Sequence, residues 1–401
     1  MRCRSFCESR RRVRSVSQMS ERETVLQFGA GNFLRAFADH FIHLANQGPN
    51  PIGKIVVVQS TPGERAQWLN DAGGRYHVVF RGIEDGERVD RVEVVESVRR
   101  AIVASDDWES VLALAESPDL RFVLSNTTEA GYDLDESDGP SSSTPRSFPA
   151  KLLQVLHRRF EARAEGLTII PCELRDDNAE LLRATLADLA SSWSLGEGFS
   201  AWLNSECKWW GTLVDRIVTG RPDEHELLES DPLLTVGEPF ALWAIQNGGE
   251  PFIDDPAIKL VEDVGPYALR KVRILNGAHT ALVSRAKSGP LKTVREAVLD
   301  PEVGAWLKKL LFEEVLPTID DRIEDGERFC HQALERFANP FVEHRLESIA
   351  LHHDSKVRVR LLPTRDEFRA QFGREPELLN KILANEGGVA ATATAISLEL
   401  L

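Results

Sequence analysis

The sequence is poor in cysteine, in long apolar runs and in positive charge. Its five cysteines, Cys3, Cys7, Cys172, Cys207 and Cys330, are scattered, so they indicate neither a disulfide framework nor a zinc site and fit a reducing cytoplasm. No apolar run approaches the roughly 18 residues that a membrane span needs. A net charge of −15 argues against a general nucleic-acid binder and against an anionic membrane surface. The 401 residues, 42% of them hydrophobic, are enough for one large or two ordinary domains.

The two ends of the chain differ in composition from the rest. Residues 1–20 carry six arginines and a single acid, which fits an organelle transit peptide or a disordered basic leader, and we expect the leader. Residues 390–401 form a run with almost no charge. A natural domain rarely ends on such a run, so we expect that part of the C-terminal domain is missing.

A strand, a glycine turn and a helix are predicted near the start. Residues 24–28 are apolar, Gly-Ala-Gly follows, and residues 34–44 have the pattern of an amphipathic helix. This layout binds a dinucleotide pyrophosphate through backbone N–H groups at the helix N-terminus. An ordinary tight turn is the alternative, because Leu34 stands where the usual third glycine would be. The candidate cofactor-binding residues are Phe28, Gly29, Ala30, Gly31, Asn32 and Phe33.

Two further predicted strands end in polar residues. The strand at 54–59 ends in Gln59 and is followed by Ser-Thr-Pro; without an acid there, this position does not decide between NAD and NADP. The strand at 121–124 is followed by Ser125, Asn126 and Thr127. Open α/β sheets bind ligands at the carboxyl ends of their strands, so Gln59, Asn126 and Thr127 are further candidates, and a capping loop is the alternative.

The remaining pattern predicts the fold class. A hairpin is expected from 76–81 and 88–97, and helices are expected at 106–116, 151–164, 178–193, 271–287, 301–316, 324–338 and 340–352. We predict an α/β protein with a Rossmann-like dinucleotide-binding domain at 21–265 and a mostly α-helical substrate domain at 266–401. Residues 221–265, rich in Pro, Gly and acids, mark the boundary.

Lys271, Asn276 and His279 carry the most chemistry. On a helix these three lie on one side, which brings a proton donor or acceptor, an amide and an imidazole to one point. Reduction of a ketone by hydride requires such a set, since a proton must reach the oxygen and donors must hold the developing oxyanion. A solvated basic patch with Arg270 and Arg273 fits the same spacing.

Residues 356–361 alternate between basic and apolar side chains. The alternation predicts a strand with Lys356, Arg358 and Arg360 on one face. That face fits an anion-binding surface or a solvated edge strand.

Several long strings resemble one family in the right order. They are 27–37 (QFGAGNFLRAF), 121–131 (RFVLSNTTEAG), 169–174 (IIPCEL), 212–220 (TLVDRIVTG) and 271–283 (KVRILNGAHTALV). Together they resemble the mannitol dehydrogenase family of polyol-specific long-chain dehydrogenases, over about residues 25–363. Within that family the chain is most similar to the branch that interconverts D-altronate and D-tagaturonate with NAD.

The resemblance implies roles for particular residues. Lys271 would be the general acid/base, Asn276 and Asn178 the oxyanion donors, and His279 the group that orients the substrate hydroxyl. Lys356 would contact the substrate, and Arg358 is the residue that we expect to bind its carboxylate. No metal is implied, and the partner is a small-molecule hexuronate.

Other functions remain open at this stage. A fructuronate reductase or a mannitol 2-dehydrogenase would use the same residues with a different pocket. A non-catalytic remnant that still binds nucleotide is the alternative from another class, and the sequence leaves the oligomeric state open.

Overall fold

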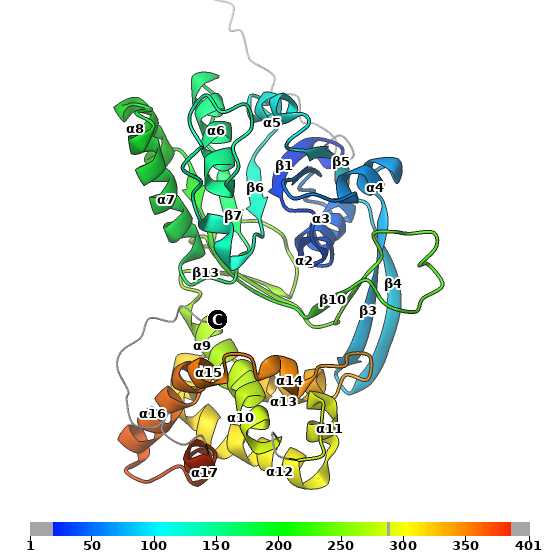
Figure 1. Cartoon of the computed structure of the whole chain (residues 1–401), viewed down its shortest axis with the longest axis vertical. Helices are drawn as coiled ribbons and strands as arrows, with labels where there is room; N and C mark the ends of the chain where they lie inside the picture. The colour runs from blue at the N-terminus through cyan, green and yellow to red at the C-terminus, as the bar shows by residue number, and fades with distance from the viewer. Residues whose placement is uncertain (1–18, 287–288, 386–401) are drawn as a thin grey trace, which may run out of the picture.

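The computed structural model describes residues 19–286 and 289–385. The expectations for the leader before residue 19 and for the uncharged run at 390–401 lie outside the described residues. The described chain forms two bodies, one above the other in Figure 1, and the strands near residues 211–261 lie between them. In the described part, no helix is both long enough and apolar enough to cross a membrane.

The upper body is built on a six-stranded parallel sheet. Its strands are β1 (Glu23–Phe28), β2 (Lys54–Gln59), β5 (Val98–Val103), β6 (Phe122–Ser125), β7 (Thr168–Pro171) and β8 (Lys208–Trp209). They lie in the order β5-β2-β1-β6-β7-β8, which is the 3-2-1-4-5-6 order of a doubly wound dinucleotide-binding sheet. The strand order reverses between β1 and β6, and ligands of such sheets bind outside the carboxyl ends at that point. The predicted α/β class is confirmed.

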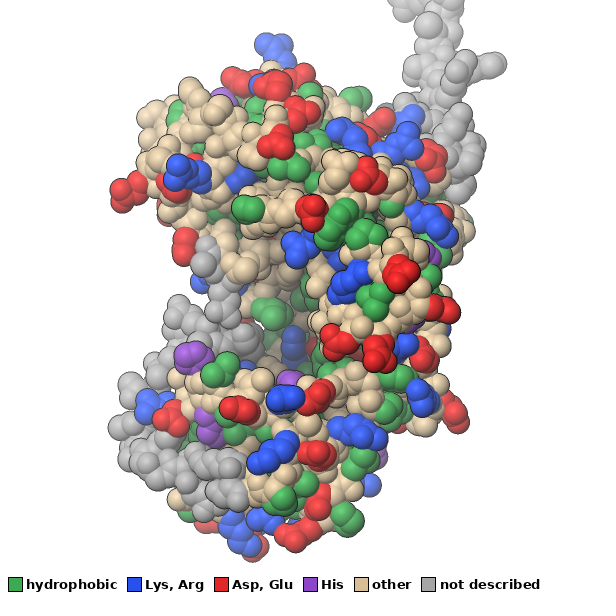
Figure 2. Space-filling view, turned by 45° about the vertical axis from the view of Figure 1, so that its right-hand side comes forward, with side chains coloured by type: hydrophobic (Ala, Val, Ile, Leu, Met, Phe, Trp, Pro, Cys, Tyr) green, Lys and Arg blue, Asp and Glu red, His purple; other side chains and the backbone are tan. Residues whose placement is uncertain are grey.

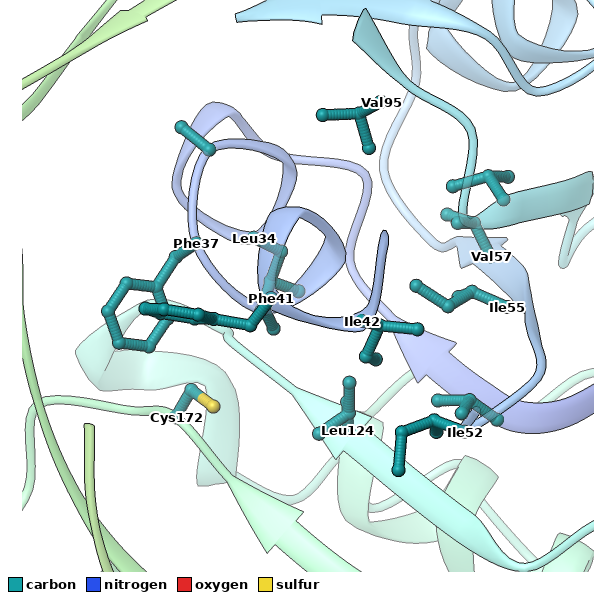
Figure 3. Packing of buried hydrophobic residues seen from close by; sticks show 14 of the residues in the cluster. Leu34, Phe37, Phe41, Ile42, Ile52, Ile55, Val57, Val95, Leu124 and Cys172 are labelled. Carbon is teal, nitrogen blue, oxygen red and sulfur yellow. The ribbon is translucent and has the colours of Figure 1, made fainter. Parts of the chain in front are cut away.

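Both faces of this sheet are covered by helices, so successive residues of a central strand enter different cores. Ile55 and Val57 of β2 belong to one apolar cluster, whereas Val56 and Val58 belong to the other. This explains why the strand has four apolar residues in a row rather than an alternating pattern. Figure 3 shows Phe37 of the β1–α3 connection and Phe41 of α3 (Ala38–Gln47) in the first cluster.

The helices of the upper body complete its layers. Besides α3 they are α2 (Asn32–Arg35), α4 (Arg65–Asp71), α5 (Trp108–Ala115), η1 (Glu129–Tyr132), α6 (Phe148–Glu161), α7 (Asn178–Ser192) and α8 (Glu197–Ser205). The aromatic side chains of α6 and α8 pack together in the second cluster.

The predicted hairpin is confirmed as β3 (Tyr76–Glu84) and β4 (Glu87–Val95), joined at Asp85 and Gly86. Both turn residues have positive φ, 52° and 79°, as a two-residue hairpin turn that follows the strand twist requires. The hairpin continues into a four-stranded sheet with β10 (Val218–Gly220) and β11 (Thr235–Gly237). A three-stranded sheet of β9 (Gly211–Asp215), β12 (Leu242–Gln246) and β13 (Ile258–Val261) follows.

The lower body is helical and has its own apolar core, drawn from residues 274–383. Its helices are α9 (Gly265–Arg270), η2 (Lys271–Asn276), α10 (Gly277–Ala286), α11 (Val294–Leu299), α12 (Pro301–Leu310), η3 (Leu311–Val315), η4 (Leu316–Thr318), η5 (Asp320–Arg322), α13 (Gly326–Phe337), α14 (Leu346–Ile349), α15 (His353–Arg360), α16 (Leu362–Phe372) and α17 (Glu377–Asn385). The predicted mostly helical C-terminal part is confirmed.

Two element predictions in this body are wrong. The helix expected at 340–352 is reduced to the short α14, and the strand expected at 356–361 is the end of helix α15 and the residue after it. Val357 and Leu361, four residues apart, both enter the lower core. That spacing places them on one side of a helix, so tertiary packing overrides the alternation of the local sequence.

A buried ion-pair cluster joins the two bodies. Arg336 of α13 is 5% exposed and donates to both carboxylate oxygens of Asp215, at 3.0 and 2.9 Å. It also donates to Glu238 at 3.0 and 2.8 Å and lies over the ring of Phe240. Burial would lower the pKa of Arg336, but Asp215 and Glu238 outweigh it and raise that pKa above its ordinary value.

We predict that Arg336→Ala destabilises the protein by about 3–5 kcal/mol, because the variant leaves two buried carboxylates without their cation. Urea unfolding followed by tryptophan fluorescence measures the change. Arg345→Ala is the matched control, since Arg345 is exposed and pairs with the exposed Glu343. Equal unfolding midpoints for the two variants would contradict this account of the joint.

Candidate active site

A cavity of about 340 Å³ lies at the junction of the two bodies. Lys271, from the lower body, lines this cavity. Figure 2 shows a hollow between the two parts, with Lys or Arg side chains visible inside it. The other lining residues come from the upper body and from the end of β9: Phe33, Asn126, Thr127, Thr128, Glu173, Leu174, Arg175, Val214, Asp215 and Arg216. The cavity therefore joins the carboxyl ends of the sheet strands to the segment that begins at Lys271.

The glycine turn after β1 has an open backbone. Gly29 has φ +121°, and a Cβ there would lie 3.2 Å from the carbonyl oxygen of Asn126, so this position favours glycine. A Cβ on Gly31 would meet no atom within 4 Å. No hydrogen bond joins the N–H groups of Ala30, Gly31 or Asn32 to another described residue. Such N–H groups at the switch point fit a dinucleotide pyrophosphate.

The side chains around this turn have different surroundings. Phe28 is 2% exposed and packs edge-on against Phe148, and its carbonyl accepts a hydrogen bond from the N–H of Asn126. Asn32 accepts a hydrogen bond from Arg35. Phe33 stacks on Phe37 and lines the cavity.

Asn126 and Thr127 lie at the cavity wall after β6 and are held by the loop after β7. Asn126 donates to the carbonyl of Cys172 at 2.6 Å. Thr127 donates its backbone N–H and its hydroxyl to Glu173 at 3.0 and 3.2 Å, and Ser125 and Tyr132 donate to the other oxygen of Glu173. Burial raises the pKa of Glu173, and these hydrogen bonds partly offset that rise.

Gln59 is engaged within its own loop. Its amide donates to the carbonyls of Thr61 and Gly63, and its oxygen accepts from the N–H of Ala66. The predicted contact between this side chain and the cofactor is therefore not supported. Gln59 instead fixes the loop that follows β2.

Lys271 and Asn276 begin and end a π-helix, η2. In such a turn the hydrogen bonds run from i to i+5, so these two residues are stacked one turn apart. Of residues 271–280, only Lys271 and Asn276 are partly exposed; the others are buried. The Asn276 carboxamide makes no hydrogen bond to another described residue. The π-turn therefore presents one amine and one unengaged amide on the same side.

Lys271 is held by β9. Its Nζ donates to the carbonyl of Val214 at 2.9 Å and lies 3.8 Å from Asp215 Oδ1, and its side chain is 14% exposed. Burial lowers the pKa of Lys271 and outweighs the opposing effect of Asp215. Repulsion from Arg270 and Arg273 is not the cause: Arg270 donates to the carbonyl of Glu324, and Arg273 pairs with Glu367.

Asp215 binds both Lys271 and Arg336, which makes it a site residue that sequence reasoning missed. Burial would raise its pKa, but the charges of Arg336 and Lys271 hold that pKa below its ordinary value. Asp215 does not pair with its neighbour Arg216, which donates to the carbonyls of Ala36, Pro239 and Phe240. The sequence signal that could have identified Asp215 is an acid at the end of an apolar strand. Glu173, which follows β7, has the same signal.

His279 is buried, at 8% exposure, and its ring lies 4.2 Å from that of Phe337 and 4.9 Å from that of His344. Its Nε2 has no hydrogen-bond partner among the described residues. Burial holds the pKa of His279 well below its ordinary value, so the imidazole is neutral. A neutral imidazole can orient a hydroxyl.

The predicted role of Asn178 as an oxyanion donor is corrected by its surroundings. It is 1% exposed. Its amide donates to the carbonyls of Pro171, Glu173 and Thr212, and its oxygen accepts from the N–H of Thr212. All of its hydrogen-bonding groups are used, so it ties β7 to β9 instead.

Lys356 and Arg358 do not share a face. They lie two residues apart on α15, and positions two apart on a helix point in different directions. Lys356 is partly buried and donates to the carbonyl of Ile349 at 2.8 Å, whereas Arg358 is exposed. The exposure of Arg358 and its separation from Lys356 do not support the prediction that Arg358 binds the substrate carboxylate.

Family models match most of the chain. A mannitol dehydrogenase Rossmann domain matches residues 23–256, and a mannitol dehydrogenase C-terminal domain matches residues 263–385. The altronate oxidoreductase of Bacillus subtilis (strain 168) is 41% identical over 373 residues, which are 89% of this chain and 77% of that protein. The altronate oxidoreductase of Klebsiella pneumoniae (strain 342) is 40% identical over 379 residues, which are 90% of this chain and 78% of that protein.

Solved structures share the fold. A substrate-free D-sorbitol dehydrogenase has a TM-score of 0.78 at 22% identity and covers 92% of this chain and 80% of its own. The Pseudomonas fluorescens mannitol 2-dehydrogenase, in a ternary complex with NAD and D-mannitol, has a TM-score of 0.72 at 22% identity, with coverages of 93% and 79%. At this identity the likeness extends to the fold alone.

The two asparagines give a contrasting prediction. Asn178→Ala leaves buried backbone groups without partners, so we expect a loss of about 1–3 kcal/mol of stability. Asn276→Ala should stay within about 0.5 kcal/mol of wild type but lower turnover by about 10²–10³-fold, the effect of one lost oxyanion donor. Thermal unfolding and steady-state rates separate the two. An Asn276→Ala variant with wild-type turnover would contradict the prediction that Asn276 is an oxyanion donor.

Proposed function

This chain belongs to the mannitol dehydrogenase family and is an oxidoreductase acting on CH–OH groups; from that premise we propose that it interconverts D-altronate and D-tagaturonate with NAD. The named relatives at about 40% identity support this substrate class. The observation that carries the proposal is the partly buried Lys271 amine, which lines the same cavity as Asn126 and Thr127. We further propose that the reaction belongs to galacturonate breakdown. The described cysteines are free, which fits a reducing cytoplasm.

The backbone N–H groups of Ala30, Gly31 and Asn32 would hold the pyrophosphate, and Asn126 and Thr127 would lie beside the nicotinamide ribose. The bound dinucleotide supplies the hydride acceptor for alcohol oxidation. Binding there needs a glycine turn with unengaged N–H groups, and this chain has one.

The chain's own groups handle the proton and the oxygen. Neutral Lys271 accepts the proton of the substrate hydroxyl as the carbon loses hydride, and it returns that proton in ketone reduction. Asn276 donates to the same oxygen while it carries negative charge. His279, through the Nε2 that lacks a partner in the described structure, orients a neighbouring hydroxyl.

The function is tested with NADH absorbance and a panel of carbonyl substrates. We expect D-tagaturonate to give the highest kcat/KM, with D-fructuronate and D-fructose at least tenfold lower. A preference for D-fructuronate or D-fructose would replace this assignment with fructuronate reductase or mannitol 2-dehydrogenase. NADH binding without turnover on any substrate would indicate a nucleotide-binding protein instead.

Lys271 gives a pH-dependent prediction. Alcohol oxidation requires the neutral form of Lys271, so the rate should fall as the pH drops through the Lys271 pKa. Because burial lowers this pKa, the fall should occur at a lower pH than for an ordinary lysine. Lys271→Met should lose at least about 10³-fold in kcat, since its proton transfer occurs only in the transition state. NADH affinity should change little, as measured by fluorescence titration. If Lys271→Met keeps substantial activity and its rate still falls at low pH, the fall must be caused by the protonation of another group.

A further inference from the structure

Helix α15 carries a buried arginine, Arg360, whose charge is not neutralised. The residue is 8% exposed. Its NH1 donates to the hydroxyl of Thr280 at 3.3 Å, and its buried Nε has no partner in the described structure. No ion pair joins Arg360 to another described residue. A buried charge is costly unless it is paired, so this arginine calls for an anion.

Hydrogen bonds connect Arg360 to the candidate active site. Thr280, which accepts from its guanidinium, donates its hydroxyl to the carbonyl of Asn276 at 3.0 Å. A Cβ on Gly277 would lie 4.0 Å from the carbonyl oxygen of Arg360. The charge of Arg360 also lowers the pKa of both Lys271 and His279. Arg360 therefore lies against the segment that carries Asn276 and His279.

The other cations of α15 differ from Arg360. Lys356 lies one turn earlier on the same side of the helix, but its amine donates to the carbonyl of Ile349. Arg358 is exposed and makes no ion pair with another described residue. Of these three, Arg360 alone combines burial, an unused donor and contact with α10.

We propose that Arg360 binds the terminal carboxylate of the substrate and makes the enzyme prefer a hexuronate to the neutral ketohexose of the same skeleton. This inference rests on the proposed function. A guanidinium can donate two parallel hydrogen bonds to a carboxylate, and the unpartnered Nε is one of the required donors. The neutral sugar offers a hydroxyl in that place and gains no charge-assisted bond.

The test compares D-tagaturonate with D-tagatose in wild type and in Arg360→Gln. Glutamine keeps a donor toward Thr280 but removes the charge. We expect kcat/KM for D-tagaturonate to fall by about 10–100-fold, the value of a charge-assisted hydrogen bond, and kcat/KM for D-tagatose to change by less than about threefold. Arg358→Gln, the matched control on the same helix, should leave the ratio of the two constants unchanged.

An unchanged ratio in folded Arg360→Gln, or an equal fall on both substrates, overturns the proposal. If Arg360→Gln does not fold, Arg360→Lys takes its place: a lysine cannot form the paired contact, so we expect the ratio to fall by about 3–10-fold, and an unchanged ratio again overturns it. Wild-type enzyme that prefers D-tagatose to D-tagaturonate overturns the proposed function itself, and with it the need for a carboxylate site. The variants therefore test the role of Arg360, and the wild type separately tests the proposed function.

Discussion

The rest of the structure depends on the carboxylate of Asp215. This buried acid accepts two hydrogen bonds from Arg336 of the helical body and lies 3.8 Å from the amine of Lys271. The contact that joins the two bodies thus also sets the position of the proposed acid/base. A second carboxylate, Glu238, shares Arg336. The charges of Asp215 and Glu238 favour the charged form of Lys271, but burial outweighs them and lowers the pKa of Lys271.

The proposed active site is assembled from segments that fold in separate cores. The glycine turn and Asn126 belong to the parallel sheet, while Lys271 and Asn276 belong to a helical segment that leads into the lower core. The π-turn adds one residue to a helical turn, which brings positions five apart into register. In a chain of net charge −15, the unneutralised Arg360 beside this segment is a local exception that suits an anionic substrate.

The sequence predicted the features that depend on local pattern. The strand, glycine turn and helix around Gly29 and the hairpin at Asp85 follow from turn chemistry and apolar spacing. The helix at 353–360 was missed because valines and basic residues alternate there, and only packing of Val357 and Leu361 on the lower core decides the outcome. Arg336 lies 121 residues from Asp215, and Thr212 lies 34 residues from Asn178. Pairings over such distances leave no periodic signal in a single sequence.

The most direct measurement is a crystal structure of the enzyme with NAD and D-altronate bound. Our account predicts that Lys271 Nζ and the Asn276 amide lie within hydrogen-bond distance of one substrate oxygen and that Asn178 keeps its contacts to Pro171 and Thr212. The same structure should show the substrate carboxylate on Arg360. A substrate oxygen bound by other groups, with Lys271 still donating to Val214 and directed away from it, would contradict the account.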